Sequence, residues 1–119
     1  MNIKTFYLNN EKTVYMKAYL LDDVDNIPWC QKRPAILIFP GGGYEFCSAR
    51  EAEPVAMRYL AEGYNAFVLY YTCNKKYPAA FINAAYALYK IRMRADEFGV
   101  DKNKIAVWGA SAGGHLAGC

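Results

Sequence analysis

Three short apolar runs, separated by segments with helical spacing, form the main pattern of the chain. They are Ala35–Phe39, Asn65–Tyr71 and Lys104–Trp108. The first is bounded by prolines on both sides, with three glycines after the second of them. Continuous apolar runs of this length are typical of strands covered on both faces, as in parallel sheets. We therefore predict three buried strands.

A helix is predicted between the first two strands. Pro54 suits a first helical position, Glu51 and Glu53 would lie near the positive end of the helix dipole, and Gly63 is a good stop. Ser48-Ala49-Arg50-Glu51 also matches a capping box. A helix begun there would carry Pro54 in its interior, so a start near Pro54 is favoured.

A longer helix is predicted from Pro78 to Gly99, between the second and third strands. Its apolar positions follow the helical period, which predicts one buried stripe. The residues of this stripe are Phe81, Ala84, Ala85, Leu88, Ile91, Ala95 and Phe98. Asp96 and Asp101 follow as helix-end and turn residues, and Asp101 is a candidate cap before the third strand.

The N-terminal residues 1–20 differ from this pattern. Ile3–Leu8 and Thr13–Leu20 contain β-branched and aromatic residues, and Asn9-Asn10 between them is a turn signal, so a hairpin is expected. Alternating strands and helices then occupy residues 34–119. The whole pattern predicts an α/β fold: a three-layer α/β/α sandwich whose twisted, mostly parallel sheet carries an N-terminal antiparallel hairpin.

Composition and charge narrow the function classes. The chain has 119 residues, the length of one domain, and a net charge of +3. A charge of +3 is too small to indicate the dense basic patch that nucleic-acid-binding proteins usually have. No apolar run approaches the roughly 18 residues of a membrane span, and the first residues lack the apolar region of a signal peptide. We therefore expect a cytoplasmic protein with no nucleic-acid or membrane partner.

The cysteines do not indicate a metal site. Cys30, Cys47, Cys73 and Cys119 are scattered without a CxxC pair, and His115 is the only histidine. Zinc sites need closely spaced pairs of such ligands, so no metal is expected. Four free thiols are the simpler interpretation.

The first candidate for chemistry is the motif Gly109-x-Ser111-x-Gly113, directly after the third strand. A serine on a sharp strand-to-helix turn needs small neighbours, because bulky ones would clash. Such a turn would expose the Ser111 hydroxyl at the edge of the sheet. The motif alone also fits a structural turn of small residues, but its place between a strand and a helix favours a nucleophile.

Two phosphate-binding motifs are alternatives to this one. A P-loop needs Lys and Ser or Thr after its last glycine, where this chain has His115 and Leu116. A dinucleotide-binding loop needs G-x-G-x-x-G. Gly41–Phe46 fails at the sixth position, and Ser111 stands in place of the second glycine in the other loop.

The second candidate is the loop Pro40-Gly41-Gly42-Gly43-Tyr44, which follows the first buried strand. Successive glycines let backbone amides turn towards a substrate oxygen without an obstructing β-carbon. Alone, the loop fits a plain connection equally well. Together with the serine motif, it is better interpreted as an oxyanion loop.

The two motifs together resemble those of the α/β-hydrolase fold. The resemblance is greatest to esterases related to acetyl-xylan esterases and to the hormone-sensitive-lipase group. It extends over most of the chain from Pro34 onward and rests on the stretches Pro40–Tyr44, Arg50–Ala56 and Ile105–Ala117. Relatives often have His at the start of the glycine loop, and Pro40 in its place favours the sugar-ester branch.

The resemblance implies a role for each site residue. Ser111 would attack an ester carbonyl, and the backbone amides of Gly42, Gly43 and Ala112 would hold the oxyanion. Tyr44 would lie beside the acyl pocket. The implied partner is a small ester substrate, such as a short acyl ester of a sugar, and no metal or organic cofactor is implied.

The catalytic triad is incomplete in these residues. In this fold the acid and then the histidine follow the serine, but none of the eight residues after Ser111 is acidic. The resemblance gives His115 a supporting role beside the turn. We therefore expect residues 1–119 to be the N-terminal portion of a single α/β-hydrolase domain, inactive alone, with an unpaired edge on the strand ending at Trp108.

Two other interpretations remain open. The chain could be a non-catalytic α/β unit, or a subunit completed by a second copy or by another chain segment. It could also belong to a peptidase or amidase on the same fold, because the two loops would look alike in both.

Overall fold

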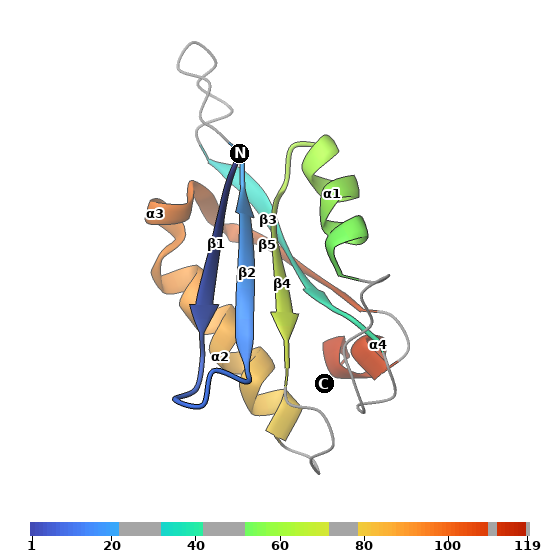
Figure 1. The fold of residues 1–119 in the computed structure, drawn as a ribbon. Coiled ribbons are helices and arrows are strands. Elements are labelled where there is room, and N and C mark those ends of the chain that lie inside the picture. The colour runs from blue at the N-terminus through green and yellow to red at the C-terminus, as the bar shows by residue number, and fades with distance from the viewer. Residues whose placement is uncertain (22–31, 42–51, 72–78, 110–111, 119) are drawn as a thin grey trace.

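The computed structural model describes residues 1–21, 32–41, 52–71, 79–109 and 112–118. It is a sheet with helices on both faces (Figure 1). Its elements are β1 (Asn2–Tyr7), β2 (Tyr15–Leu20), β3 (Arg33–Phe39), α1 (Glu53–Ala61), β4 (Asn65–Tyr70), α2 (Ala79–Met93), α3 (Ala95–Phe98), β5 (Val100–Gly109) and α4 (Ala112–Ala117). The predicted α/β sandwich is confirmed.

The five strands form one mixed sheet in the order β1-β2-β4-β3-β5. β3 lies parallel to both β4 and β5, as predicted for the three apolar runs. β1 and β2 form the predicted antiparallel hairpin, and β2 also pairs antiparallel with β4. The hairpin thus extends the parallel strands on one side.

The hairpin turn is held by the side chain of Asn9. Its Oδ1 accepts hydrogen bonds from the backbone N–H groups of Thr13, at 3.0 Å, and Val14, at 3.1 Å. Its Nδ2 donates to the Thr13 hydroxyl at 2.7 Å. These bonds explain why the Asn9-Asn10 signal marks the turn correctly, because an Asn side chain can replace the backbone partners that a turn lacks.

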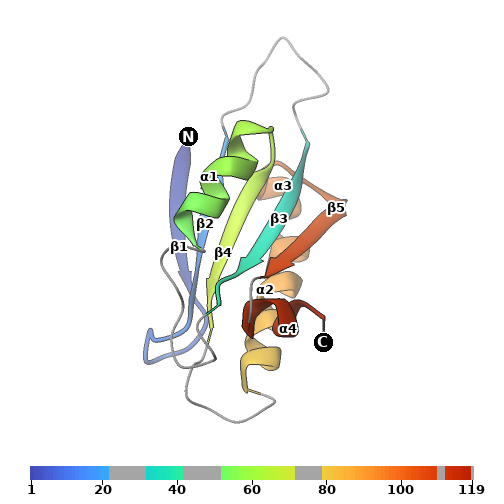
Figure 2. The same ribbon diagram turned by 90° about the vertical axis from the view of Figure 1, so that its right-hand side faces the viewer.

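Side chains alternate between the two faces of the sheet and form one core on each. Figure 2 shows α1 on one face of the sheet and α2 on the other. Along β3, Ile36 and Ile38 pack on the α1 face, while Leu37 and Phe39 pack on the opposite face. That opposite face is covered by α2, α3 and α4. Strands buried on both faces must be apolar throughout, which is why the continuous runs predicted them.

Helix α1 begins at Glu53 with Pro54 in its first turn, as predicted. The competing start at Ser48 lies outside the described residues. The hydroxyl of buried Tyr19 on β2 donates to Glu53 Oε2 at 3.0 Å and ties the start of the helix to the sheet. Burial and, after it, this hydrogen bond raise the pKa of Tyr19, so it remains a neutral donor at physiological pH.

The long predicted helix is divided in two, and part of its predicted stripe is wrong. α2 ends at Met93, Arg94 interrupts it, and the short α3 follows up to Gly99, which has a left-handed φ of 67°. Ala84, Leu88, Ile91, Ala95 and Phe98 contact the core as predicted. Phe81 and Ala85 are exposed instead, because they line an open apolar groove beside β5 and α4.

The third predicted strand is present as β5, but it is not buried along its length. Val107 is 43% exposed, and Lys104 and Ala106 are also exposed. β5 is the last strand of the described sheet, and it pairs only with β3 there. Its other edge therefore has no partner strand within the described part of the chain, as the sequence led us to expect, and side chains on both of its faces are exposed.

Asn65 is a buried polar residue that connects three parts of the fold. It is 1% exposed at the start of β4. Its Oδ1 accepts from the backbone N–H of Leu21 at 2.9 Å, and its Nδ2 donates to the backbone carbonyl of Phe98 at 2.9 Å. The side chain thus links the ends of β2 and α3 through β4.

Replacing Asn65 with alanine should lower the free energy of unfolding by about 2–4 kcal/mol. The change leaves the buried Phe98 carbonyl and the partly buried Leu21 N–H without this partner, and an unsatisfied group costs about 1–3 kcal/mol when it is buried. Urea unfolding would measure the loss. Asn65→Asp is the informative comparison, since it keeps the acceptor for Leu21 but removes the donor for Phe98. Wild-type stability in both variants would contradict this account.

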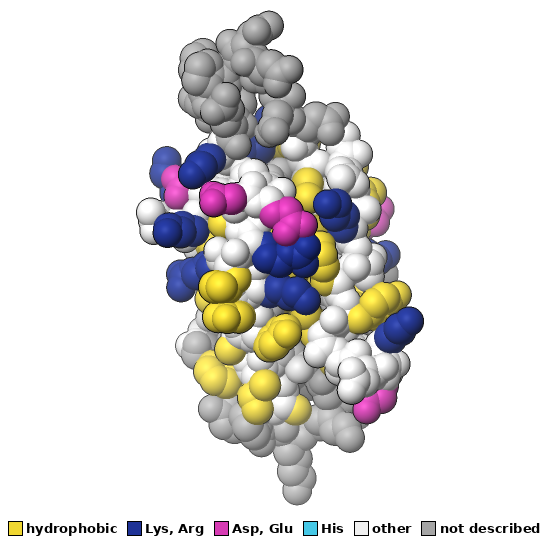
Figure 3. Space-filling model, turned by 90° about the vertical axis from the view of Figure 1, so that its left-hand side faces the viewer, with side chains coloured by type: hydrophobic (Ala, Val, Ile, Leu, Met, Phe, Trp, Pro, Cys, Tyr) yellow, Lys and Arg dark blue, Asp and Glu magenta, His cyan; other side chains and the backbone are white. Residues whose placement is uncertain are grey.

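Cations at and just after the end of α2 lie next to aromatic side chains. Arg94 lies 4.7 Å from the ring centre of Phe6, and Lys90 lies 5.9 Å from that of Tyr86. Figure 3, which faces this side, shows Lys and Arg side chains grouped above several hydrophobic ones.

None of the described helices has the length and hydrophobicity needed to cross a membrane.

Candidate active site

Both glycine-rich motifs leave the sheet from the same edge. β3, β4 and β5 run parallel, so their carboxyl ends meet there, at the bottom of Figure 1. Phe39, the last residue of β3, is the register partner of Gly109, the last residue of β5. The chain positions that precede the glycine loop and the serine turn are therefore neighbours in the sheet. In open α/β sheets, ligand sites form outside these carboxyl ends.

Most of the predicted site residues lie outside the described part of the chain. These residues are Gly42, Gly43, Tyr44 and Ser111. Ala112 is the first residue of α4, and His115 belongs to the same helix. The described structure places the segments on either side of Ser111 and the segment that precedes Gly42.

Gly113 shows why the serine motif needs a glycine after the serine. A β-carbon at this position would lie 1.9 Å from the carbonyl oxygen of Phe39 and 2.9 Å from that of Pro40. Both are backbone atoms, so neither can swing away as the end of a flexible side chain could. The crowding predicted for this motif is confirmed at Gly113. Helix α4 rests directly on the peptide that leads into the glycine loop.

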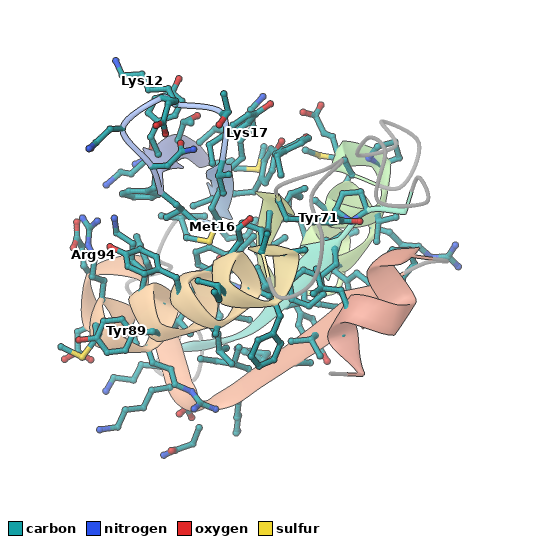
Figure 4. All side chains as sticks on the ribbon, turned by 90° about the horizontal axis from the view of Figure 1, so that it is seen from below. Lys12, Met16, Lys17, Tyr71, Tyr89 and Arg94 are labelled. Atoms are coloured by element: carbon teal, nitrogen blue, oxygen red, sulfur yellow. The ribbon has the colours of Figure 1, made fainter. Side chains whose placement is uncertain are left out.

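Tyr71 contacts the same segment from the β4 side of β3. It follows β4, is 3% exposed, and packs in the core that α2 and α4 cover. Its hydroxyl donates a buried hydrogen bond to the carbonyl oxygen of Pro40. Tyr71 is labelled in Figure 4, which looks along the strands onto this edge.

Sequence reasoning missed Tyr71. Its place at the end of an apolar run predicts burial alone, and nothing in its spacing marks a hydroxyl that reaches a backbone carbonyl 31 residues earlier in the chain. A signal was present, because a tyrosine at the end of a buried strand needs a partner for its hydroxyl. That signal indicates a hydrogen bond without naming the acceptor.

The acidic residues that precede the serine in the sequence lie at the amino ends of the parallel strands, away from the glycine-rich motifs. Asp96 belongs to α3, and Asp101 lies at the amino end of β5, where its Oδ1 accepts from the Asn103 N–H at 3.0 Å. This bond is local, as expected of Asp101, but the residue lies within β5 and not in a turn before it. Both aspartates line a polar pocket with Lys32 and Arg92. This pocket is separated from the glycine loops by the length of β5, and we assign it no part in the candidate site.

Within the described ranges, no three His, Cys, Asp or Glu side chains come together in a way that could hold a metal ion. The four cysteines are outside these ranges, and so is the acidic stretch 22–25. The described residues bring together backbone groups at the carboxyl ends of β3 and β5.

Comparison with known proteins identifies the family of the chain. The family model described as BD-FAE matches residues 28–119, which include both glycine-rich motifs. Among curated proteins, the chain is 38% identical over 94 residues to endo-1,4-beta-xylanase B of Butyrivibrio fibrisolvens. That match spans 73% of this chain but only 14% of the xylanase.

Solved structures share the fold over nearly the whole chain. The α/β-hydrolase enzyme MGS-M1, from a Medee basin deep-sea metagenome library, superposes with a TM-score of 0.94 and 47% identity. An acetyl ester-xyloside bifunctional hydrolase from Caldicellulosiruptor lactoaceticus superposes with a TM-score of 0.84 and 31% identity. Each match covers 98% of this chain, but the chain spans only 49% of the first enzyme and 44% of the second.

Proposed function

The chain belongs to the BD-FAE family and has the α/β-hydrolase fold, and on that premise we propose that the protein containing it is a serine hydrolase of carboxylic esters. The observation that carries the proposal is the register pairing of Phe39 with Gly109. This pairing starts the glycine loop and the serine turn side by side at the carboxyl edge of the sheet. A nucleophile and oxyanion donors must converge on one carbonyl group, and neighbouring starting points allow that.

In the proposed reaction, the Ser111 hydroxyl gives its proton to the general base as its oxygen attacks the ester carbonyl carbon, which forms a tetrahedral intermediate. The backbone N–H groups of Gly42, Gly43 and Ala112 donate hydrogen bonds to its negatively charged oxygen. The alcohol then leaves with the proton returned by the base, and water, deprotonated by the same base, releases the acid from the acyl-enzyme. One donor of this kind contributes about 2.7–4 kcal/mol of transition-state stabilisation.

We propose short acyl esters, including acyl esters of sugars, as the substrates. One relative, described as an acetyl ester-xyloside bifunctional hydrolase, supports acyl esters of sugars, and a second, described as a xylanase, supports a carbohydrate substrate. Pro40 at the start of the glycine loop agrees with the sugar-ester branch, and Tyr44 would border the acyl group.

The proposed base and acid of the triad come from outside residues 1–119. In this fold they follow the serine in the order acid, then histidine. We assign His115, on the helix directly after the serine, a supporting role instead. The 119 residues alone should therefore show negligible ester turnover. Brisk hydrolysis by the purified 119-residue chain would contradict this part of the proposal and make His115 the base.

A fluorophosphonate probe on the full-length protein tests the nucleophile. The probe reacts with an activated serine, so peptide mapping after labelling should find the adduct on Ser111 at about one per chain. An adduct only on another residue, or no adduct in folded protein, would refute the assignment.

The reaction class is tested by matched ester and amide substrates with the same acyl group. An esterase should hydrolyse the ester much faster, whereas a peptidase or amidase should retain high turnover on the amide. A folded full-length protein that hydrolyses neither would favour the non-catalytic α/β unit.

A further inference from the structure

We propose that Tyr71 is a positioning residue for the oxyanion loop, acting through its hydrogen bond to the Pro40 carbonyl. The inference rests on the proposed ester hydrolysis, because it concerns how the loop that carries Gly42 and Gly43 is aimed. Tyr71 directly follows β4, a strand that supplies none of the proposed nucleophile or oxyanion donors.

The hydrogen bond acts where the ordered strand passes into the loop. β3 ends at Phe39, and Pro40 is fully buried immediately after it. The Pro40 carbonyl belongs to the peptide that joins Pro40 to Gly41. Fixing the orientation of that peptide constrains the direction in which the chain continues towards Gly42 and Gly43.

Three contacts hold this segment from different directions. Phe39 is paired with Gly109 of β5, Gly113 of α4 approaches the carbonyls of Phe39 and Pro40, and the Tyr71 hydroxyl bonds to Pro40. The first two belong to elements that flank Ser111. Tyr71 adds a third contact from the β4 side of β3, opposite the side on which β5 pairs. The end of β3, where the glycine loop begins, is therefore held from both of its neighbouring strands.

Glycines make such an anchor necessary. Gly41, Gly42 and Gly43 follow one another, and each can adopt many more backbone conformations than other residues. Oxyanion donors work because they are oriented before the reaction. Pro40 limits the backbone on one side of the peptide, and the hydrogen bond from Tyr71 limits its carbonyl. The two restraints reduce the conformations open to the first glycine.

A purely structural role makes a different prediction. If Tyr71 only fills space, its ring is what matters, and Tyr71→Phe keeps the ring while removing the hydroxyl. If the hydroxyl positions the loop, the same variant should weaken interactions that form in the transition state. Such a loss lowers kcat and leaves KM nearly unchanged.

The experiment compares Tyr71→Phe with wild type in the full-length protein, using a short acyl ester and counting active sites by fluorophosphonate titration. We expect kcat per active site to fall about 10- to 100-fold, with KM within about twofold. A boronic acid that mimics the tetrahedral intermediate should bind more weakly by a similar factor. Tyr15→Phe, which removes one hydroxyl from the α1 face of the sheet, should leave all three quantities unchanged.

Several outcomes would overturn the inference. These are an unchanged kcat, a rise in KM alone, an unchanged boronic acid affinity, or a Tyr71→Phe protein that does not fold, which would assign the hydroxyl to stability. Failure of the underlying proposed function looks different. In that case the wild-type protein itself would show no adduct on Ser111 and no ester turnover.

Discussion

Replacing Ser111 with alanine should lower kcat for ester hydrolysis by about 10⁴- to 10⁶-fold in the full-length protein, because loss of the nucleophile disables a serine triad as a unit. Residual activity above the uncatalysed rate is still expected, since the oxyanion donors and the bound substrate remain. The decisive measurements are initial rates with a short acyl ester, combined with fluorophosphonate labelling of the same preparation.

The chain supplies a matched control, because Ser48 is its only other serine. Ser48→Ala removes the same atom from the segment before α1 and should retain wild-type kcat and labelling. Both variants should unfold at the wild-type temperature, so that a rate difference cannot come from unfolding. Ester hydrolysis that persists in Ser111→Ala at more than about a tenth of the wild-type rate would rule out Ser111 as the nucleophile.

The sequence predicted the fold well where burial alone decides the pattern. β3 and β4 are covered on both faces, so their apolar runs are unbroken and unambiguous. β5 has an equally apolar run around Ile105, yet Val107 is 43% exposed. Hydrophobicity indicates that a residue can be buried. Whether it is buried depends on whether segments far away in the sequence pack on it.

The same limit explains the errors in α2. Phe81 and Ala85 have the spacing of a core stripe, but the part of the stripe they occupy borders the open groove beside β5. Arg94 interrupts the helix, where its guanidinium pairs with Glu97 at 2.6 Å. A single period cannot reveal such an interruption, because Ile91, Ala95 and Phe98 keep their apolar spacing across it.

The candidate site was predictable as a pair of motifs but not as a set of contacts. Glycine spacing identified Gly113 and its steric reason, since a crowded turn selects against any side chain. It could not identify Phe39 and Pro40 as the backbone that crowds it, or Tyr71 as the donor to the same segment. Those contacts depend on the parallel register of β3, β4 and β5, which apolar runs do not encode.

Gly113→Ala should be among the most damaging single-atom additions in the described chain. The new β-carbon would stand 1.9 Å from the Phe39 carbonyl oxygen, so either α4 or the end of β3 must move by more than an ångström. Overpacking typically costs about 1–3 kcal/mol and occasionally more. Since the clash is with backbone, we expect about 3 kcal/mol of lost unfolding free energy, measured in urea.

Activity should fall further than stability alone explains. Any shift that relieves the clash moves the Phe39–Pro40 segment relative to the turn that carries Ser111, and oxyanion donors lose most of their effect when displaced by about 1 Å. Gly118→Ala is the control, because it adds the same methyl group at an exposed position just after α4. Gly113→Ala protein that is as stable and as active as Gly118→Ala would show that α4 does not press on β3 as described. The close contact would then have no part in aligning the serine with the loop.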